Sequence, residues 1–322
     1  MNKRVYGVIG IASVMANWNA DFSGYPKTIS DGRIFGSDKA LKYPMKKMWE
    51  NEGKKVLYIK SMKFSENKKG EVSLVPRSLK ERYEFLFGEL QKDSRKVLTN
   101  LLTAVDVKNF GATFAESDNN ISITGAVQFG QGFNIYEESE AQEQQILSPF
   151  RDSSKEGEEN KKGKDKKEEE KKGEARNSTL GTKIVSDEAH YMYPFAINPM
   201  AYKELVELDV TEGYTEEDYL NFKRTALVSA TSYATNAKEG CENEFAMFVE
   251  TEQTTYLPNL TAYIVFRKEN GKNTITVSCG TLFKEIGEKI LSTEIYYNPD
   301  TTILQSDIEN VKIYHILTQK EV

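Results

Sequence analysis

The chain has 322 residues, 39% of them hydrophobic, and a formal net charge of −6. This length and composition fit one large domain over 1–322 and exclude a wholly disordered chain. Two cysteines, Cys241 and Cys279, exclude a disulfide framework and indicate a reduced, cytoplasmic protein. With two histidines and no C-x-x-C pair, we expect no zinc site.

The charge is unevenly distributed along the chain. Residues 1–100 hold 20 Lys and Arg against 11 Asp and Glu, whereas residues 101–322 hold 23 against 38. Because fields at cellular salt are local, a basic first third can attract phosphates although the whole chain is acidic. Ordinary charge scatter is the alternative interpretation.

The first elements are the clearest. The apolar, β-branched run over 4–15 predicts a buried strand rather than a secretory signal. A polar loop over 16–36 follows, and Ser37 is a candidate N-cap for a helix over 38–52, which Pro44 interrupts. The next patterns predict a strand over 54–64, a hairpin turn at 66–70, helices over 78–90 and 92–105, and strands over 107–115 and 121–129.

The middle of the chain differs in composition from the rest. Residues 151–176 hold 10 positive and 9 negative side chains and no large apolar one, which predicts a disordered insertion. An aromatic strand over 189–197 follows. A helix over 214–235 has Thr215 and Asp218 placed close to a capping box. Later strands are expected over 244–250, 262–267, 274–279, 294–297 and 311–317.

The order strand, helix, strand, strand, helix, strand predicts an α+β fold of the ferredoxin-like type, which RNA-recognition modules also use. Such a fold is shared by many functions and says little about this one. No stretch approaches the roughly 20 apolar residues of a membrane span, so we expect no membrane partner.

Motifs for catalysis are weak. There is no G-x-S-x-G elbow and no phosphate-binding P-loop, and Gly130-Gln131-Gly132 gives only G-x-G. Three aspartates in or beside the first loop could bind Mg²⁺, but loop aspartates more often form turns and caps. These are Asp21, Asp31 and Asp38. We therefore expect no catalytic residue, no metal and no cofactor.

The best constellation is basic and polar, and it suits successive phosphates at the start of a helix. Its members are Asn17, Asn19, Lys27, Arg33, Ser37, Lys42, Lys46 and Lys47. Lys42 and Lys46 are four residues apart and share a helix face. A solvated helix face is the alternative interpretation.

Several segments, in order, resemble one family. Residues 31–47 resemble the basic loop and Leu-Lys-x-x-x-Lys helix of Cascade backbone subunits. Residues 106–112 (Asp-Val-Lys-Asn-Phe-Gly-Ala) resemble the "Asp-Val-Arg-x-Phe-Gly" segment of the type I-B members. Residues 124–130 resemble their "Thr-Gly-Pro-Val-Gln-Phe" segment, with Ala126 in place of Pro, and 193–199 and 213–218 resemble later segments. The chain thus resembles the backbone subunit of type I-B CRISPR Cascade, a RAMP protein of the seventh CRISPR-associated family.

The resemblance implies a modified RNA-recognition palm with large insertions that form finger and thumb elements. It implies a non-catalytic subunit that binds the guide RNA (crRNA) and oligomerises along it for recognition of target DNA in antiviral defence. Other copies and other Cascade subunits are the implied protein partners. The thumb is expected within 130–195. Arg33, Ser37, Lys42 and Lys46 are the implied guide-backbone contacts, with Gln128 and Gln131 on the palm.

Three other functions stay open. In a type III-like subunit, a first-loop aspartate would cut target RNA. A guide-processing RAMP nuclease is a second enzyme hypothesis, although a well-placed histidine is not evident. A soluble α/β protein outside CRISPR systems is the third.

Overall fold

The computed structural model describes residues 1–148, 179–269 and 271–322. The charged insertion predicted over 151–176 lies outside these described residues. The fold is α+β, with several separate sheets. Among the described segments, no helix is long and apolar enough to cross a membrane.

The main sheet is built around its first strand. β1 (Lys3–Ala16) pairs antiparallel with β10 (Thr179–Ile197) on one side and with β11 (Cys241–Glu252) on the other. The path of this sheet runs β16-β14-β11-β1-β10-β8-β2, and β7 and β9 also pair with β10. These further strands are β2 (Phe35–Gly36), β7 (Val127–Phe129), β8 (Gly132–Asn134), β9 (Ala141–Ser148), β14 (Ile290–Tyr297) and β16 (Lys312–His315).

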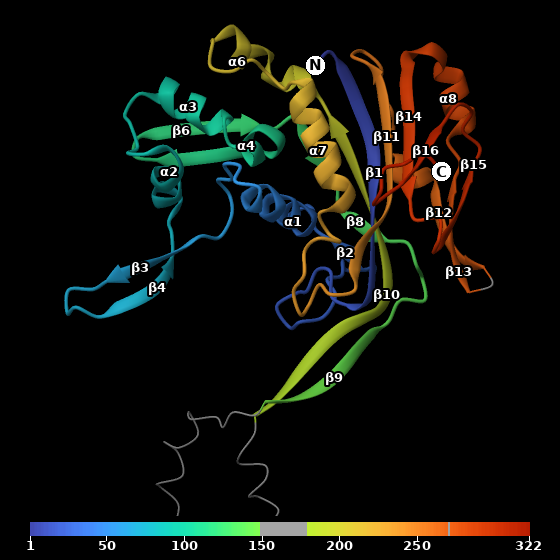
Figure 1. Ribbon diagram of the computed structural model, residues 1–322, viewed down its shortest axis with the longest axis horizontal. Coiled ribbons are helices and arrows are strands. Elements are labelled where there is room, and N and C mark those ends of the chain that lie inside the picture. The colour runs from blue at the N-terminus through green and yellow to red at the C-terminus, as the bar shows by residue number, and fades with distance from the viewer. Residues whose placement is uncertain (149–178, 270) are drawn as a thin grey trace, which may run out of the picture.

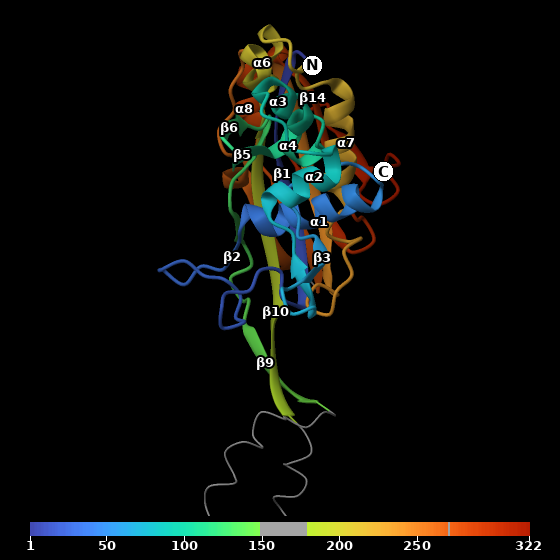
Figure 2. The same ribbon diagram turned by 90° about the vertical axis from the view of Figure 1, so that its left-hand side faces the viewer.

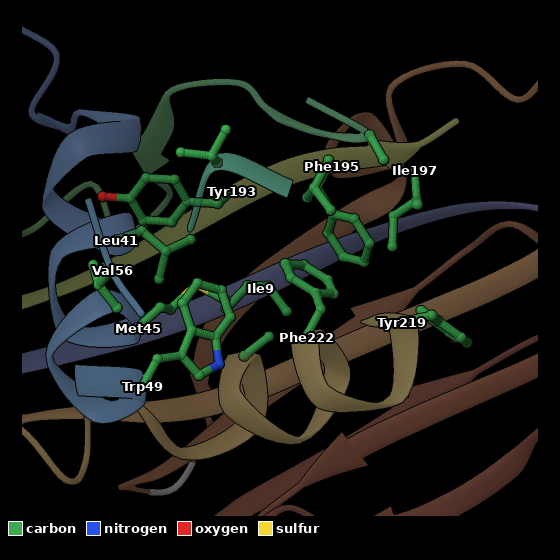
Figure 3. Close-up of a cluster of buried hydrophobic side chains, with 14 of the residues drawn as sticks. Ile9, Leu41, Met45, Trp49, Val56, Tyr193, Phe195, Ile197, Tyr219 and Phe222 are labelled. Atoms are coloured by element: carbon green, nitrogen blue, oxygen red, sulfur yellow. The ribbon is translucent and has the colours of Figure 1, made fainter. Parts of the chain in front are cut away.

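Each face of the main sheet has its own core. On one face, α1 (Asp38–Asn51) and α7 (Glu216–Val228) pack over side chains of β1 and β10, as Figure 3 shows for Ile9, Trp49 and Phe222. The other face buries Val8 and Met192 against a C-terminal layer. That layer contains β12 (Ile264–Glu269), β13 (Lys272–Val277), β15 (Thr302–Ser306) and α8 (Gly280–Ile286).

A lobe beyond α1 forms the outer part of the helical side (Figure 1). It contains α2 (Leu79–Phe87), α3 (Ser94–Leu102), α4 (Val105–Phe110), β5 (Gly111–Glu116) and β6 (Asn119–Thr124). The hairpin of β3 (Met62–Glu66) and β4 (Val72–Pro76) extends from this lobe, and the short α6 (Lys203–Glu207) precedes α7.

A second hairpin projects from the main sheet, away from both cores (Figures 1 and 2). Residues 179–186 of β10 pair with β9, and residues 186–197 of the same strand pair with β1. The hairpin arm and the sheet interior therefore share one uninterrupted strand. This hairpin lies within 130–195, where the thumb is predicted.

The early elements and the caps confirm the sequence predictions. The first strand, the α1 helix and the 66–70 turn lie where expected. Ser37 caps α1, and Thr215 forms a capping box with Asp218 at the start of α7. The helix runs through Pro44, which is buried. α7 ends at Val228, earlier than expected, and the carboxamide of Asn243 accepts the amide of Ala230 just beyond it.

Two strand predictions in the first half are wrong in part. Within 54–64 only the part from Met62 is strand, because the buried carboxylate of Asp106 accepts the amides of Leu57 and Tyr58 at 2.8 Å each and holds that segment irregular. Residues 105–110 form helix α4 rather than strand. The strand begins at Gly111, whose positive φ of 82° favours glycine at the helix-to-strand turn.

Candidate nucleic-acid interface

The first loop is held to the start of α1 and to the projecting hairpin. The side-chain oxygen of Asn19 accepts the amide of Ser37 at 2.8 Å, and the Ser37 hydroxyl accepts the amide of Ala40 at 3.4 Å. Asn17, which is buried, donates to the carbonyls of Gly24 (2.8 Å) and Ile184 (3.3 Å). Both asparagines of the predicted site thus position the loop rather than face solvent freely.

The loop also meets the palm residues through two glycines. Gly36 of β2 pairs with Gly132 of β8, and Tyr193 lies beneath both. A Cβ at either glycine would collide with Tyr193, whose hydroxyl accepts the indole N–H of Trp18 at 2.6 Å. Burial raises the pKa of Tyr193 well above its usual value, so the phenol stays neutral. The glycines therefore allow the loop to sit directly on the sheet.

Gln128 and Gln131, the predicted palm residues, are both exposed. Gln128 lies in β7, where its Nε2 donates to the carbonyl of Gly125 at 2.8 Å. Gln131 lies in the turn between β7 and β8, next to the Gly36–Gly132 pair. The structure thus brings Gln131 next to the end of the first loop, whereas Gln128 lies opposite Ala196 of β10.

Two cations of the loop reach the surface beside aromatic rings. The Lys27 ammonium lies 5.7 Å from the ring centre of Phe35, and the Arg33 guanidinium lies 5.0 Å from that of Phe133. Arg33 also pairs with Asp31 at 2.8 Å, and its backbone and side-chain N–H groups hold the pKa of Asp31 below the usual range. Both groups of this pair are exposed, so the pair is screened and easily exchanged for a phosphate.

Three lysines of α1 have polar partners within the protein. Lys42 pairs with Asp38 and Lys47 with Glu50, each at 2.8 Å. Lys46 donates to the carbonyl of Tyr58 at 3.2 Å, and burial lowers its pKa. Lys42 and Lys46 do share a face, as predicted, and that face looks onto the ring of Phe110.

Sequence reasoning gave no role to two exposed side chains here. Lys39 lies in the first turn of α1, and Phe22 lies in the Asp21–Tyr25 turn of the loop with its whole ring in solvent. The only signal for Phe22 was a lone aromatic between turn formers, in Asp21-Phe22-Ser23-Gly24.

The three candidate aspartates each have a structural partner. Asp21 accepts three hydrogen bonds within its own turn, Asp31 pairs with Arg33, and Asp38 pairs with Lys42. Within the described parts of the chain, no three His, Cys, Asp or Glu side chains gather in a way that could hold a metal ion.

Comparison with known proteins bears on this architecture. The sequence profile of the family described as "CRISPR-associated protein Cas7" matches residues 3–278. A solved chain from "CRISPR RNA-guided surveillance complex, pre-nicking" superimposes with a TM-score of 0.51 at 13% sequence identity, over 97% of each chain. At this identity the likeness shows a common fold. No curated protein matches the chain. Because the profile match spans most of the sequence, the chain belongs to the CRISPR-associated protein Cas7 family.

Proposed function

We propose that this chain is a non-catalytic, cytoplasmic backbone subunit of a type I-B Cascade, in which several copies line up along one guide RNA. The observation that carries the proposal is the β9–β10 hairpin, which projects beside the first loop. Membership of the Cas7 family, and a fold shared with a chain of an RNA-guided surveillance complex, support a crRNA partner. Target DNA would then pair with the guide, and other Cascade subunits would bind the ends of the array.

The palm in this proposal is the β11-β1-β10-β8 part of the main sheet. Its strands are antiparallel, with α1 following β1 and α7 following β10 along the chain. This order matches the β-α-β-β-α-β arrangement of RNA-recognition modules and supports a palm of that type.

Guide phosphates are proposed to lie across the end of the first loop and the start of α1. Lys27, Arg33 and Lys39 supply exposed or half-exposed cations there, and the N-terminus of α1 adds its backbone dipole. Gln128 and Gln131 are proposed to add side-chain amide contacts from the palm. Contacts of this kind follow the RNA backbone and carry no sequence information. The target sequence would therefore be recognised by base pairing with the guide.

The rival function is cleavage of target RNA by a first-loop aspartate, as in type III relatives. The hydrogen bonds of Asp21 count against it, because one carboxylate oxygen already accepts three donors of its own turn. We therefore favour a subunit without catalytic residues.

Co-expression of the tagged chain with a CRISPR transcript tests the proposal. We expect RNA of uniform length to co-purify with a multimer that dissociates after ribonuclease treatment. A monomer free of RNA would contradict the proposal. Incubation of the assembly with complementary RNA and Mg²⁺ should leave that RNA intact, whereas cuts at regular intervals would favour the type III-like alternative.

A further inference from the structure

The ring of Phe22 is fully exposed to solvent. Its relative accessibility is 114%, the highest of any large hydrophobic side chain in the described residues. Single exposed apolar side chains are common on protein surfaces, so exposure alone carries no function. The support beneath the ring and its place on the molecule are what set it apart.

The turn that bears Phe22 is closed by its own hydrogen bonds. Oδ1 of Asp21 accepts the amide and hydroxyl of Ser23 at 2.8 Å each and the amide of Tyr25 at 3.1 Å. The amide of Asp21 donates to the carbonyl of Tyr25 at 2.8 Å, and Gly24 adopts a positive φ of 92°. Phe22 therefore stands on a small, cross-linked turn.

This turn is fastened to both strands of the projecting hairpin. Asn17 joins the carbonyl of Gly24 to that of Ile184 in β10, and the Tyr25 hydroxyl donates to Glu143 in β9. Asn19 ties the same loop to Ser37 at the start of α1. Phe22 thus belongs to the junction of hairpin, loop and helix, where the guide is proposed to pass.

We propose that Phe22 is a stacking platform for one unpaired base of the guide at the root of the β9–β10 hairpin. The inference rests on the proposed RNA-binding function and adds a base contact to it. A phenyl ring offers a π-face and no hydrogen-bonding group, so it would accept any base, as a subunit that serves many guides requires.

The immediate neighbours favour a base over a protein partner. Protein-binding hot spots are clusters of large side chains, whereas Phe22 stands between Asp21 and Ser23 in a turn of the polar loop. Positive charge lies in the same loop, where Arg33 is exposed and Lys27 half-exposed. An exposed aromatic ring in a loop that also carries accessible cations fits the composition of a single-strand binding surface.

The test uses the full chain and a short unstructured RNA in which 2-aminopurine replaces one base at a time. With the parent protein, we expect fluorescence quenching at one position of the bound RNA. F22W should keep the quenching. F22A and F22L should abolish it and weaken RNA binding roughly tenfold. Phe64→Ala is the matched control, because Phe64 is 76% exposed on the separate β3–β4 hairpin and should leave both signals unchanged.

The outcomes separate this inference from the function on which it rests. If the parent does not bind RNA, the proposed function fails. If the parent binds RNA while F22A matches it in affinity and quenching, Phe22 is not a stacking platform. Loss of association between copies with unchanged quenching would also overturn the inference and assign Phe22 to a protein contact. Thermal melting of each variant would check that the substitution leaves the fold intact.

Discussion

The Nζ atom of Lys46 lies 3.9 Å from the carboxylate of Asp106, which is almost completely buried. The same carboxylate accepts the amides of Leu57 and Tyr58, so the pair ties α1 to the irregular segment before β3. Lys46 is therefore part of the protein's internal framework. A test of RNA binding needs cations whose removal leaves that framework intact, namely Arg33 and Lys39.

Arg33→Glu with Lys39→Glu should weaken guide binding without loss of the fold. Both side chains are exposed, and each is proposed to face the RNA backbone. A plot of log affinity against log salt has a negative slope for RNA binding. Loss of two phosphate contacts should make this slope shallower by about 1.4. Filter binding over a salt series measures this slope. Lys284→Glu in α8 is the matched charge reversal and should retain the parent slope, and equal slopes in all variants would place the phosphates elsewhere.

Asp106→Ala should destabilise the fold strongly. It leaves two amides without their acceptor and Lys46 without its carboxylate, at a cost of roughly 2–5 kcal/mol of unfolding free energy. Urea denaturation followed by circular dichroism measures the loss. Glu89→Ala, at an exposed site just beyond α2, is the control and should change little. A midpoint for Asp106→Ala equal to that of the control would contradict the framework role.

Stability should fall as the pH rises above about 6.5, through His190. Although burial opposes protonation, Glu244 at 2.8 Å and Glu188 at 3.0 Å raise the pKa of His190 above its usual value. Because the folded pKa is raised, this stabilisation is complete below the unfolded value of about 6.5 and is lost as pH rises through the folded pKa.

Urea midpoints taken from about pH 6 to about pH 9 check this window. His190→Gln should flatten the decline over that range. His315→Gln, at the only other histidine of the chain, should leave the decline in place. An unchanged slope in His190→Gln would show that other groups cause it.

Gly36→Ala should displace the first loop from the sheet. The added Cβ would collide with the Tyr193 hydroxyl and the Trp18 ring, and both side chains are buried and fixed by their mutual hydrogen bond. We expect a loss of roughly 1–3 kcal/mol in stability and weaker RNA binding, because overpacking forces these rings to move. Denaturation and RNA titration measure the two effects.

The control for this substitution is Gly53→Ala. A Cβ at Gly53 meets no neighbour within 4 Å, so its cost comes from the positive φ of 78° alone. Gly53→Ala should therefore lower stability but leave the RNA affinity of the folded protein unchanged. Equal RNA affinity in the parent and in Gly36→Ala would contradict the role given to the Gly36 contact.

Short sequence patterns predicted the elements that depend on residues close together in the chain. The apolar run of β1, the serine cap of α1 and the capping box of α7 each depend on residues a few positions apart. The predicted strand over 54–64 failed in its first part because a residue far along the chain decides it. Asp106 turns inward to amides about fifty positions earlier, and periodicity carries no sign of such a contact.

The candidate site was predictable to the same extent. The polar loop, its cations and the palm glutamines could be named from composition and order, and the structure places the end of the loop next to Gln131. The inward turn of Lys46 and the hydrogen bond from Asn17 to Ile184 could not be predicted from the sequence. In each case the acceptor carbonyl lies in another part of the chain. Phe22 was passed over because an isolated aromatic in a loop has no periodic pattern.

The continuity of β10 constrains how copies of the chain could be arranged. One strand of 19 residues serves first as the arm of the hairpin and then as a neighbour of β1. A single extended strand paired along its length has no joint at which the arm could swing. Identical rigid pieces of this kind, placed one after another, would repeat with one rise and one rotation. The length of RNA covered by each copy would then be set by the protein and would be the same for every RNA.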